Sequence, residues 1–192
     1  YLSDFNSNGG YALLDSNVKM YDSRNYAIMI RTTDFENGFN LNKVKYINEK
    51  AYNLLEKSKL FGNEIIMNKI GSAGKTFIMP ELNYPASLGR NDFLIRLTKK
   101  CEVKFIYDVL NSDFGKNDIQ QYVKGALTKT ITKDNVRRLL IPFPPLAEQK
   151  EILSQVERLL QTVSILENQI TKREEITKLL MQSILKDAFG EN

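Results

Sequence analysis

The apolar residues of the first 144 positions fall in short runs that are separated by polar or glycine-containing segments. Runs of this length, rich in branched and aromatic side chains, are typical of strands. Two of the runs flank the tight segment 71–74, which predicts a β-hairpin. The predicted strands are 26–33, 64–70, 75–80 and 92–97.

Helical spacing of apolar residues occurs between and after these strands. A helix is predicted over 48–59, with Asn48 as its N-cap. A second helix is predicted at 103–110, where every third or fourth residue is apolar. A third, short helix is predicted over 119–123, and Gly125 ends it.

The remaining segments of this part are predicted to be irregular. The polar run 34–42 indicates a loop, and 139–143 is expected to be extended because prolines follow it. Since strands and helices interleave, we expect 1–144 to form one α+β (mixed α/β) globular domain. The strand order is left open.

The last 48 residues have a different pattern, because 146–189 contains neither glycine nor proline. Apolar residues recur in alternating steps of four and three, which predicts a coiled-coil seam. Arg173 and Thr177 interrupt the seam before Leu180 and Ile184 resume it. Pro145 fits the first turn of such a helix, which would be roughly 65 Å long. We therefore expect 145–192 to be a spacer and dimerisation helix whose seam is Ile152, Val156, Leu159, Val163, Leu166 and Ile170.

Charge and composition narrow the functional classes. The chain has 27 basic and 23 acidic residues; six of the basic and eight of the acidic residues lie in 145–192. The first 144 residues therefore carry +6 and the last 48 carry −2, which favours a polyanionic partner for the globular part. The absence of histidine and the single Cys101 argue against histidine-based catalysis, zinc sites and disulfides. We expect a binding module of the reducing cytoplasm, without a cofactor or metal of its own.

The segment Gly71–Thr76 (GSAGKT) has part of a nucleotide-binding P-loop. The complete pattern needs glycine at the position of Lys69 and a helix after the loop, whereas an apolar strand follows here. A basic hairpin tip that contacts DNA phosphates through Lys69, Ser72 and Lys75 fits better. An ordinary tight turn with solvated lysines is the alternative.

Two more segments carry side chains suited to DNA. Arg90 and Asn91 precede a predicted strand, and arginine and asparagine are the residues that pair bidentately with guanine and adenine. The loop 124–130 (KGALTKT) offers Lys124, Thr128 and Lys129 for phosphates or base edges. A plain solvated loop is an equal alternative.

The order of these features resembles the specificity subunits of type I restriction-modification enzymes. The resemblance is most specific in IPFPPLAEQKEIL (141–153), which runs directly into the long helix. ITKDNVRRLLIPFPP (131–145) resembles the lead into that helix, and GNEIIMNKIGSAGKT (62–76) resembles the family's hairpin, with Asn63-Glu64 in place of Gly-Asp. IMIRTTDF (28–35) resembles a strand end that adds Arg31 and Thr32 to the DNA-binding candidates.

The resemblance implies a target recognition domain followed by a spacer helix. Family members usually hold two such units, whose helices pair antiparallel, so that each domain reads one half of a split double-stranded DNA target. Their modification subunits bind S-adenosylmethionine and methylate adenine, and their restriction subunits cut DNA. This chain would then be non-catalytic, and either a half-subunit that pairs with a second copy or one half of a longer protein.

Two other interpretations remain open at this point. The chain could be the recognition segment of a fused methyltransferase–endonuclease, or a coiled-coil assembly protein that never contacts DNA. The Asn/Asp-Pro-Pro-aromatic tetrad of methyl transfer is absent, since Phe143 precedes Pro144-Pro145 and Leu146 follows.

Overall fold

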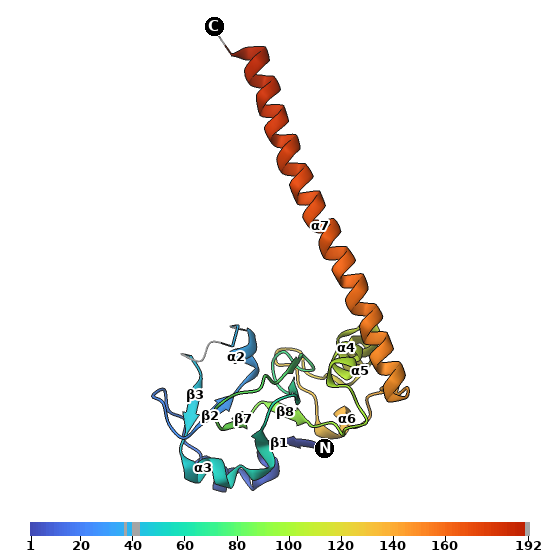
Figure 1. Cartoon of the computed structure of the whole chain (residues 1–192). Coiled ribbons are helices and arrows are strands. Elements are labelled where there is room, and N and C mark those ends of the chain that lie inside the picture. Colours follow the sequence, from blue (N-terminus) through green and yellow to red (C-terminus); the bar gives the residue numbers. More distant parts are fainter. Residues whose placement is uncertain (37, 40–42, 191–192) are drawn as a thin grey trace. The chain divides into compact units, whose positions relative to one another are not determined.

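The computed structural model describes residues 1–36, 38–39 and 43–190, and its contacts divide the chain into two units, 1–149 and 150–192. Within the described residues, the first unit contains two four-stranded sheets, several short helices and the start of the long helix α7 (Leu146–Phe189) (Figure 1). This mixture of strands and helices followed by one long helix confirms the predicted α+β class.

The first sheet is antiparallel throughout. Its strands lie in the order β1 (Leu2–Asp4), β8 (Asp92–Ile95), β5 (Ile65–Asn68) and β6 (Thr76–Ile78). The β5–β6 hairpin confirms the prediction, although both strands are shorter than expected. They end early because 69–75 leaves the ladder and forms the tip, where Gly71 and Gly74 adopt φ values of 91° and 90°.

The second sheet combines a parallel pair with antiparallel edges. Its order is β3 (Lys45–Ile47), β2 (Ala27–Ile30), β7 (Ala86–Leu88) and β4 (Lys59–Leu60), with β2 and β7 parallel. Both faces of β2 are buried: Ile28 and Ile30 pack in one apolar cluster, and Ala27 and Met29 in another. The first cluster also contains Ile66 and Leu94 of the other sheet, so one core joins the two sheets.

Short helices cover these sheets and connect the strands. The predicted cap of α3 is confirmed, because Asn48 Oδ1 accepts a hydrogen bond from Ala51 N at 2.9 Å. The apolar face predicted around 103–110 is confirmed in α4, which buries Ile106 and Leu110. The helices of the first unit are η1 (Phe5–Asn8), α1 (Tyr11–Asn17), α2 (Thr32–Glu36), α3 (Glu49–Leu54), η2 (Glu56–Ser58), α4 (Val103–Asn111), α5 (Asp113–Tyr122) and α6 (Lys133–Val136).

Several local predictions were wrong. The segment predicted as a loop over 34–42 begins inside the helix α2, where Asp34 Oδ2 accepts the backbone N–H of Arg31 at 2.8 Å; residues 37 and 40–42 lie outside the described residues. The helix predicted over 48–59 ends at Leu54 and continues as the 3-10 turn η2. The strands β1, β3, β4 and β7 and the helices η1, α1 and α6 were not predicted.

The helix α7 is continuous from Leu146 to Phe189. Pro145 lies before the helix rather than in its first turn, and its carbonyl accepts the hydrogen bond of Gln149 N at 3.0 Å. Val156 of the predicted seam is half-buried and the other five seam residues are exposed. None of the described helices, α7 included, is long and apolar enough to cross a membrane.

Candidate nucleic-acid interface

The DNA-contacting residues predicted from the sequence concentrate in three segments that backbone hydrogen bonds join. Lys69 N donates to Asn91 O at 2.7 Å, and Gly71 N donates to Lys129 O at 2.8 Å. Segments far apart in the sequence therefore form one edge of the first unit. We call this surface the basic edge and define it as 69–75, 89–91 and 124–131.

The hairpin tip of the basic edge presents backbone donors. Gly71, Gly74 and Lys75 use their N–H groups in backbone hydrogen bonds, whereas those of Ser72 and Ala73 donate to no described residue. A Cβ on Gly74 would lie 2.3 Å from the side chain of Ile119, so only glycine fits between the tip and α5. Ser72 is exposed and Ala73 is buried, so the unused amide of Ser72 is the one suited to an anion such as a phosphate.

A hollow of 290 Å³ lies beside the tip and is surrounded by positive charge. Its walls include Ser72 and Lys75 of the tip, Lys116 of α5 and Lys129 of the loop 124–131. Lys116 was not a sequence candidate, because helix α5 was predicted to begin only at 119. The N-cap of α5 is Ser112, whose side chain accepts a hydrogen bond from the N–H of Gly115 at 3.2 Å. A serine is a typical N-cap, so it could have indicated from the sequence that the helix begins at 113.

Four basic candidates are held by carboxylates of the same unit. Lysines and arginines in such pairs have a competing partner that a DNA phosphate must displace. By contrast, Lys116, Lys124 and Lys129 are exposed and form no ion pair with a described residue. The four pairs are Arg31–Asp34 at 2.6 Å, Lys69–Asp4 at 3.6 Å, Lys75–Glu36 at 2.7 Å and Arg90–Asp15 at 2.8 Å.

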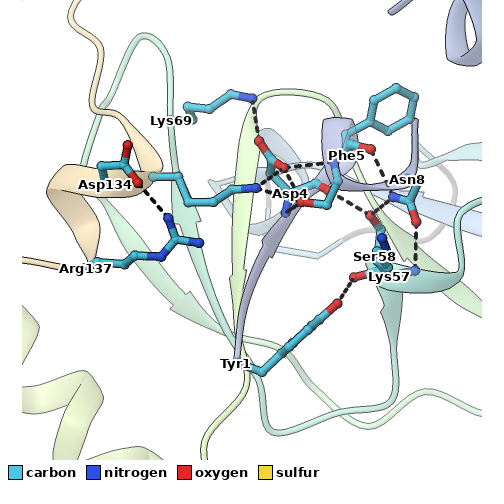
Figure 2. Close-up of polar contacts among 11 residues, drawn as sticks. Tyr1, Asp4, Phe5, Asn8, Lys57, Ser58, Lys69, Asp134 and Arg137 are labelled. Atoms are coloured by element: carbon cyan, nitrogen blue, oxygen red, sulfur yellow. Dashed lines mark hydrogen bonds and ion pairs between the residues drawn. The ribbon is translucent and has the colours of Figure 1, made fainter. Parts of the chain in front are cut away.

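Lys69 belongs to a network that ties three parts of the unit together (Figure 2). Asp4 of β1 accepts a hydrogen bond from Lys133 Nζ of α6 at 2.6 Å, and the ammonium of Lys69 lies on its other oxygen. Burial disfavours the charged carboxylate, but Lys133, Ser7 and Lys69 outweigh it and hold the pKa of Asp4 below its ordinary 3.8. Only 15% of the Lys69 side chain is exposed, so this ammonium acts mainly within the fold.

Thr32 lies in a buried polar cluster with Asn68 and Asp92. Its backbone N–H donates to Asp92 Oδ2 at 3.3 Å, and its hydroxyl accepts from Asn68 Nδ2 at 2.6 Å. Burial of Asp92 raises the pKa of this carboxyl to about 6, although hydrogen bonds from Thr32 and Asn68 oppose the shift. The cluster lines a pocket of about 370 Å³, together with Arg31 and Arg90.

The other predicted residues lie at the surface. Ser72, Asn91, Lys124, Thr128 and Lys129 are exposed. Arg31 and Arg90 are about one-third exposed, at 33% and 31% of their side-chain surface. Among the described residues, no three His, Cys, Asp or Glu side chains are grouped so that they could hold a metal ion.

Comparisons with a family model and with curated proteins point to the same protein family. The model of the type I restriction modification DNA specificity domain matches residues 3–177. The specificity subunit of the type I restriction enzyme EcoBI from Escherichia coli is 27% identical over 163 residues, which cover 84% of this chain and 34% of that protein. The EcoKI specificity subunit from Escherichia coli strain K12 is 26% identical over 175 residues, or 88% of this chain and 37% of that protein.

A solved structure shares the fold. The HsdS subunit from Thermoanaerobacter tengcongensis superposes with a TM-score of 0.55 and 18% identity, covering 91% of this chain and 44% of that chain. The chain thus spans about one-third of the length of the curated relatives it matches. With the family model matching most of its residues, the chain belongs to the type I restriction modification DNA specificity domain family.

Proposed function

We propose that this chain is a DNA-recognising specificity subunit, or half of one, that reads one half of a split double-stranded target. The observation that carries the proposal is the basic edge and its surroundings: Lys124 and Lys129 of the edge and Lys116 of α5 form no ion pair with a described residue, and the N–H groups of Ser72 and Ala73 at the hairpin tip donate to no described residue. Phosphate contacts of this kind position a protein on DNA, and exposed side chains beside them can reach base edges. Asn91 and Thr128 are exposed beside these lysines.

The distribution of charge supports the same interpretation. The first 144 residues carry +6, and Lys116, Lys124 and Lys129 add positive charge where no described carboxylate neutralises it. Each lysine that neutralises a DNA phosphate releases counterions, so binding through this edge should weaken steeply as the salt concentration rises.

The relatives are specificity subunits of restriction enzymes, which supports a division of labour between subunits. On this proposal the chain contributes no catalytic group. Modification subunits bind S-adenosylmethionine and methylate adenine, and a restriction subunit cuts the DNA. A second recognition unit, from a second copy or from the other half of a longer chain, pairs antiparallel through α7.

The test measures binding of the whole chain to a random-sequence duplex over a range of salt concentrations, alone and with its modification subunit. We expect log Kd to rise linearly with log salt. The chain alone, supplied with Mg²⁺ and S-adenosylmethionine, should neither cut nor methylate DNA. Absent or salt-insensitive DNA retention under both conditions would instead indicate a coiled-coil assembly protein.

A further inference from the structure

Two arginines flank the pocket above the Thr32–Asn68–Asp92 cluster, and they differ in which N–H groups are free. A guanidinium has five N–H donors, and its Nε and Nη2 atoms form an edge with two parallel N–H groups. That edge can pair with two acceptors at once.

In Arg31 this edge is occupied. Nε donates to Asp34 Oδ2 at 3.2 Å and Nη2 donates to Asp34 Oδ1 at 2.6 Å, so one carboxylate takes both donors. Asp34 is itself buried and also accepts the backbone N–H of Arg31, which fixes the pair within the fold. Nη2 also donates to Lys43 O at 3.3 Å, so both bidentate edges of the Arg31 guanidinium, Nε/Nη2 and Nη1/Nη2, are taken up within the fold.

In Arg90 the same edge is free. Its single side-chain hydrogen bond within the described residues runs from Nη1 to Asp15 Oδ1 at 2.8 Å. The guanidinium carbon lies 5.1 Å from the centre of the Phe5 ring, which supports the group from one side. Nε and Nη2 of Arg90 donate to no described residue, and about one-third of the side chain is exposed.

The groups that hold Arg90 are themselves well fixed. Phe5 is 2% exposed and follows Asp4, whose ion pairs with Lys69 and Lys133 anchor this segment (Figure 2). Asp15 lies in α1, next to Leu14, which is buried in the core. A guanidinium that is held by one atom and supported on one side loses little conformational entropy when it binds.

We propose that Arg90 is a specificity-determining residue that reads a guanine, and that Asp15 is its positioning residue; this rests on the proposed function. Nε and Nη2 donate to O6 and N7 of guanine, the base whose major-groove edge presents two acceptors. A two-donor edge can pair with a phosphate as well as with a base. We assign it to a base because the unpaired lysines of the basic edge already supply sequence-independent contacts to phosphates.

The test is selection from a random duplex library by the whole chain with its modification subunit. The selected motif should contain a G·C pair that R90A no longer prefers, with a loss of discrimination on the order of tenfold to a hundredfold at that position alone. K129A is the matched control: it should bind more weakly and select the same motif. R90A should melt at the temperature of the parent.

Two further arms separate reading from folding. Replacing the selected guanine by 7-deazaguanine removes the N7 acceptor. This replacement should weaken DNA binding by the parent protein and leave DNA binding by R90A unchanged. D15A should lose discrimination at this one position while overall affinity rises, since a negative charge is removed. D15N keeps an acceptor for Nη1 and should restore most of the discrimination.

Three results would overturn the inference. R90A could select the parental motif, R90A could bind all sequences equally less well as a phosphate contact would, or the position that R90A loses could be an A·T pair. A parent chain that retains no DNA, or that binds DNA without selecting any motif, would overturn the proposed function itself, whereas a parental motif that R90A also selects would overturn only the reading role of Arg90.

Discussion

Asn68 donates from Nδ2 to Asp92 Oδ1 over 3.3 Å, while its own Oδ1 is buried without a hydrogen-bond partner among the described residues. Asp92 is 1% exposed, so its charge has little contact with water. The pair therefore places a costly ionised group and an unsatisfied acceptor side by side at the floor of one pocket.

Asp92 makes the stability of the first unit depend on pH. Its folded pKa, about 6, is higher than the ordinary 3.8, so between these values the native state binds more protons than the unfolded state. Stability from this group is present at the acidic end and is lost as the pH rises through 6. We expect the parent to lose on the order of 1 kcal/mol per pH unit across that window. Chemical denaturation of the parent and of D92N between about pH 4.5 and about pH 7.5 measures this loss.

The D92N variant should not show this loss, because asparagine does not titrate. Asn68 can also turn its amide so that Oδ1 accepts from the new amide group. Stability curves of parent and variant that stay parallel between pH 4.5 and 7.5 would contradict the raised pKa, whatever their vertical separation.

Removing the charge of Glu36 should strengthen DNA binding. Its carboxylate pairs with Lys75 Nζ at 2.7 Å, and E36Q releases this lysine to a phosphate. We expect a severalfold lower Kd and a salt slope steeper by about one. E49Q is the matched control, because Glu49 is exposed on α3, outside the basic edge. Equal effects of both substitutions would mean that net charge alone governs binding.

Lys116 should behave as a phosphate contact although no sequence motif marked it. K116A removes one of the unpaired charges beside the hairpin tip, so binding should weaken for all sequences and the salt slope should fall by about one. K50A, an exposed lysine on α3, should leave both unchanged. A K116A protein with the parental slope would place the DNA elsewhere on the unit.

Gln149 should be the most sensitive residue of the segment that enters α7. Its side chain is fully buried: Oε1 accepts Glu102 N at 2.9 Å, and Nε2 donates to Pro144 O at 2.8 Å. Q149L removes both bonds and should cost about 1–3 kcal/mol in the free energy of unfolding. The exposed Gln155 is the control, since its side chain bonds only Glu151 among the described residues, and Q155L should change stability by less than about 0.5 kcal/mol.

The proposed role of α7 as a spacer predicts a change in the DNA target. Four residues inserted after Leu166 add about one turn, roughly 6 Å, and keep the seam nearly in phase. Since DNA rises about 3.4 Å per base pair, the gap between half-sites should grow by one or two base pairs while each half-site stays the same. Mapping of the methylated adenines, in the presence of the modification subunit, measures the number of base pairs between the half-sites. An unchanged gap at full activity would show that the helix does not set the spacing.

Periodicity was sufficient to predict the long regular elements. The β5–β6 hairpin and α7 followed from apolar spacing and from where glycine and proline do and do not occur. The N-terminal elements β1, η1 and α1 were missed because 2–17 has neither a long apolar run nor a sustained helical period. The strand β1 forms by pairing with β8, about 90 residues away, as between Ser3 and Leu94.

The sequence predicted which basic residues lie in the candidate site, but it did not predict the ion pairs that they form. The sequence marks Lys69, Lys75 and Arg90 as basic, yet their carboxylate partners lie 65, 39 and 75 positions away. The burial of Gln149 was not predicted for a related reason. The acidic residues near it are explained by the helix dipole, and no residue close to it in the sequence indicates that its side-chain amide is buried.

Two carboxylates of the first unit can alter the charge of the basic edge without any change in the side chains that we propose contact DNA. Asp15 and Glu36 sit on α1 and α2, outside the basic edge, and each controls one cation that belongs to it. A single substitution on either helix can free or restrain that cation without disturbing the hairpin. Under selection for new DNA targets, such acidic positions could change first, tuning retention and fidelity separately before any base-contacting residue is replaced.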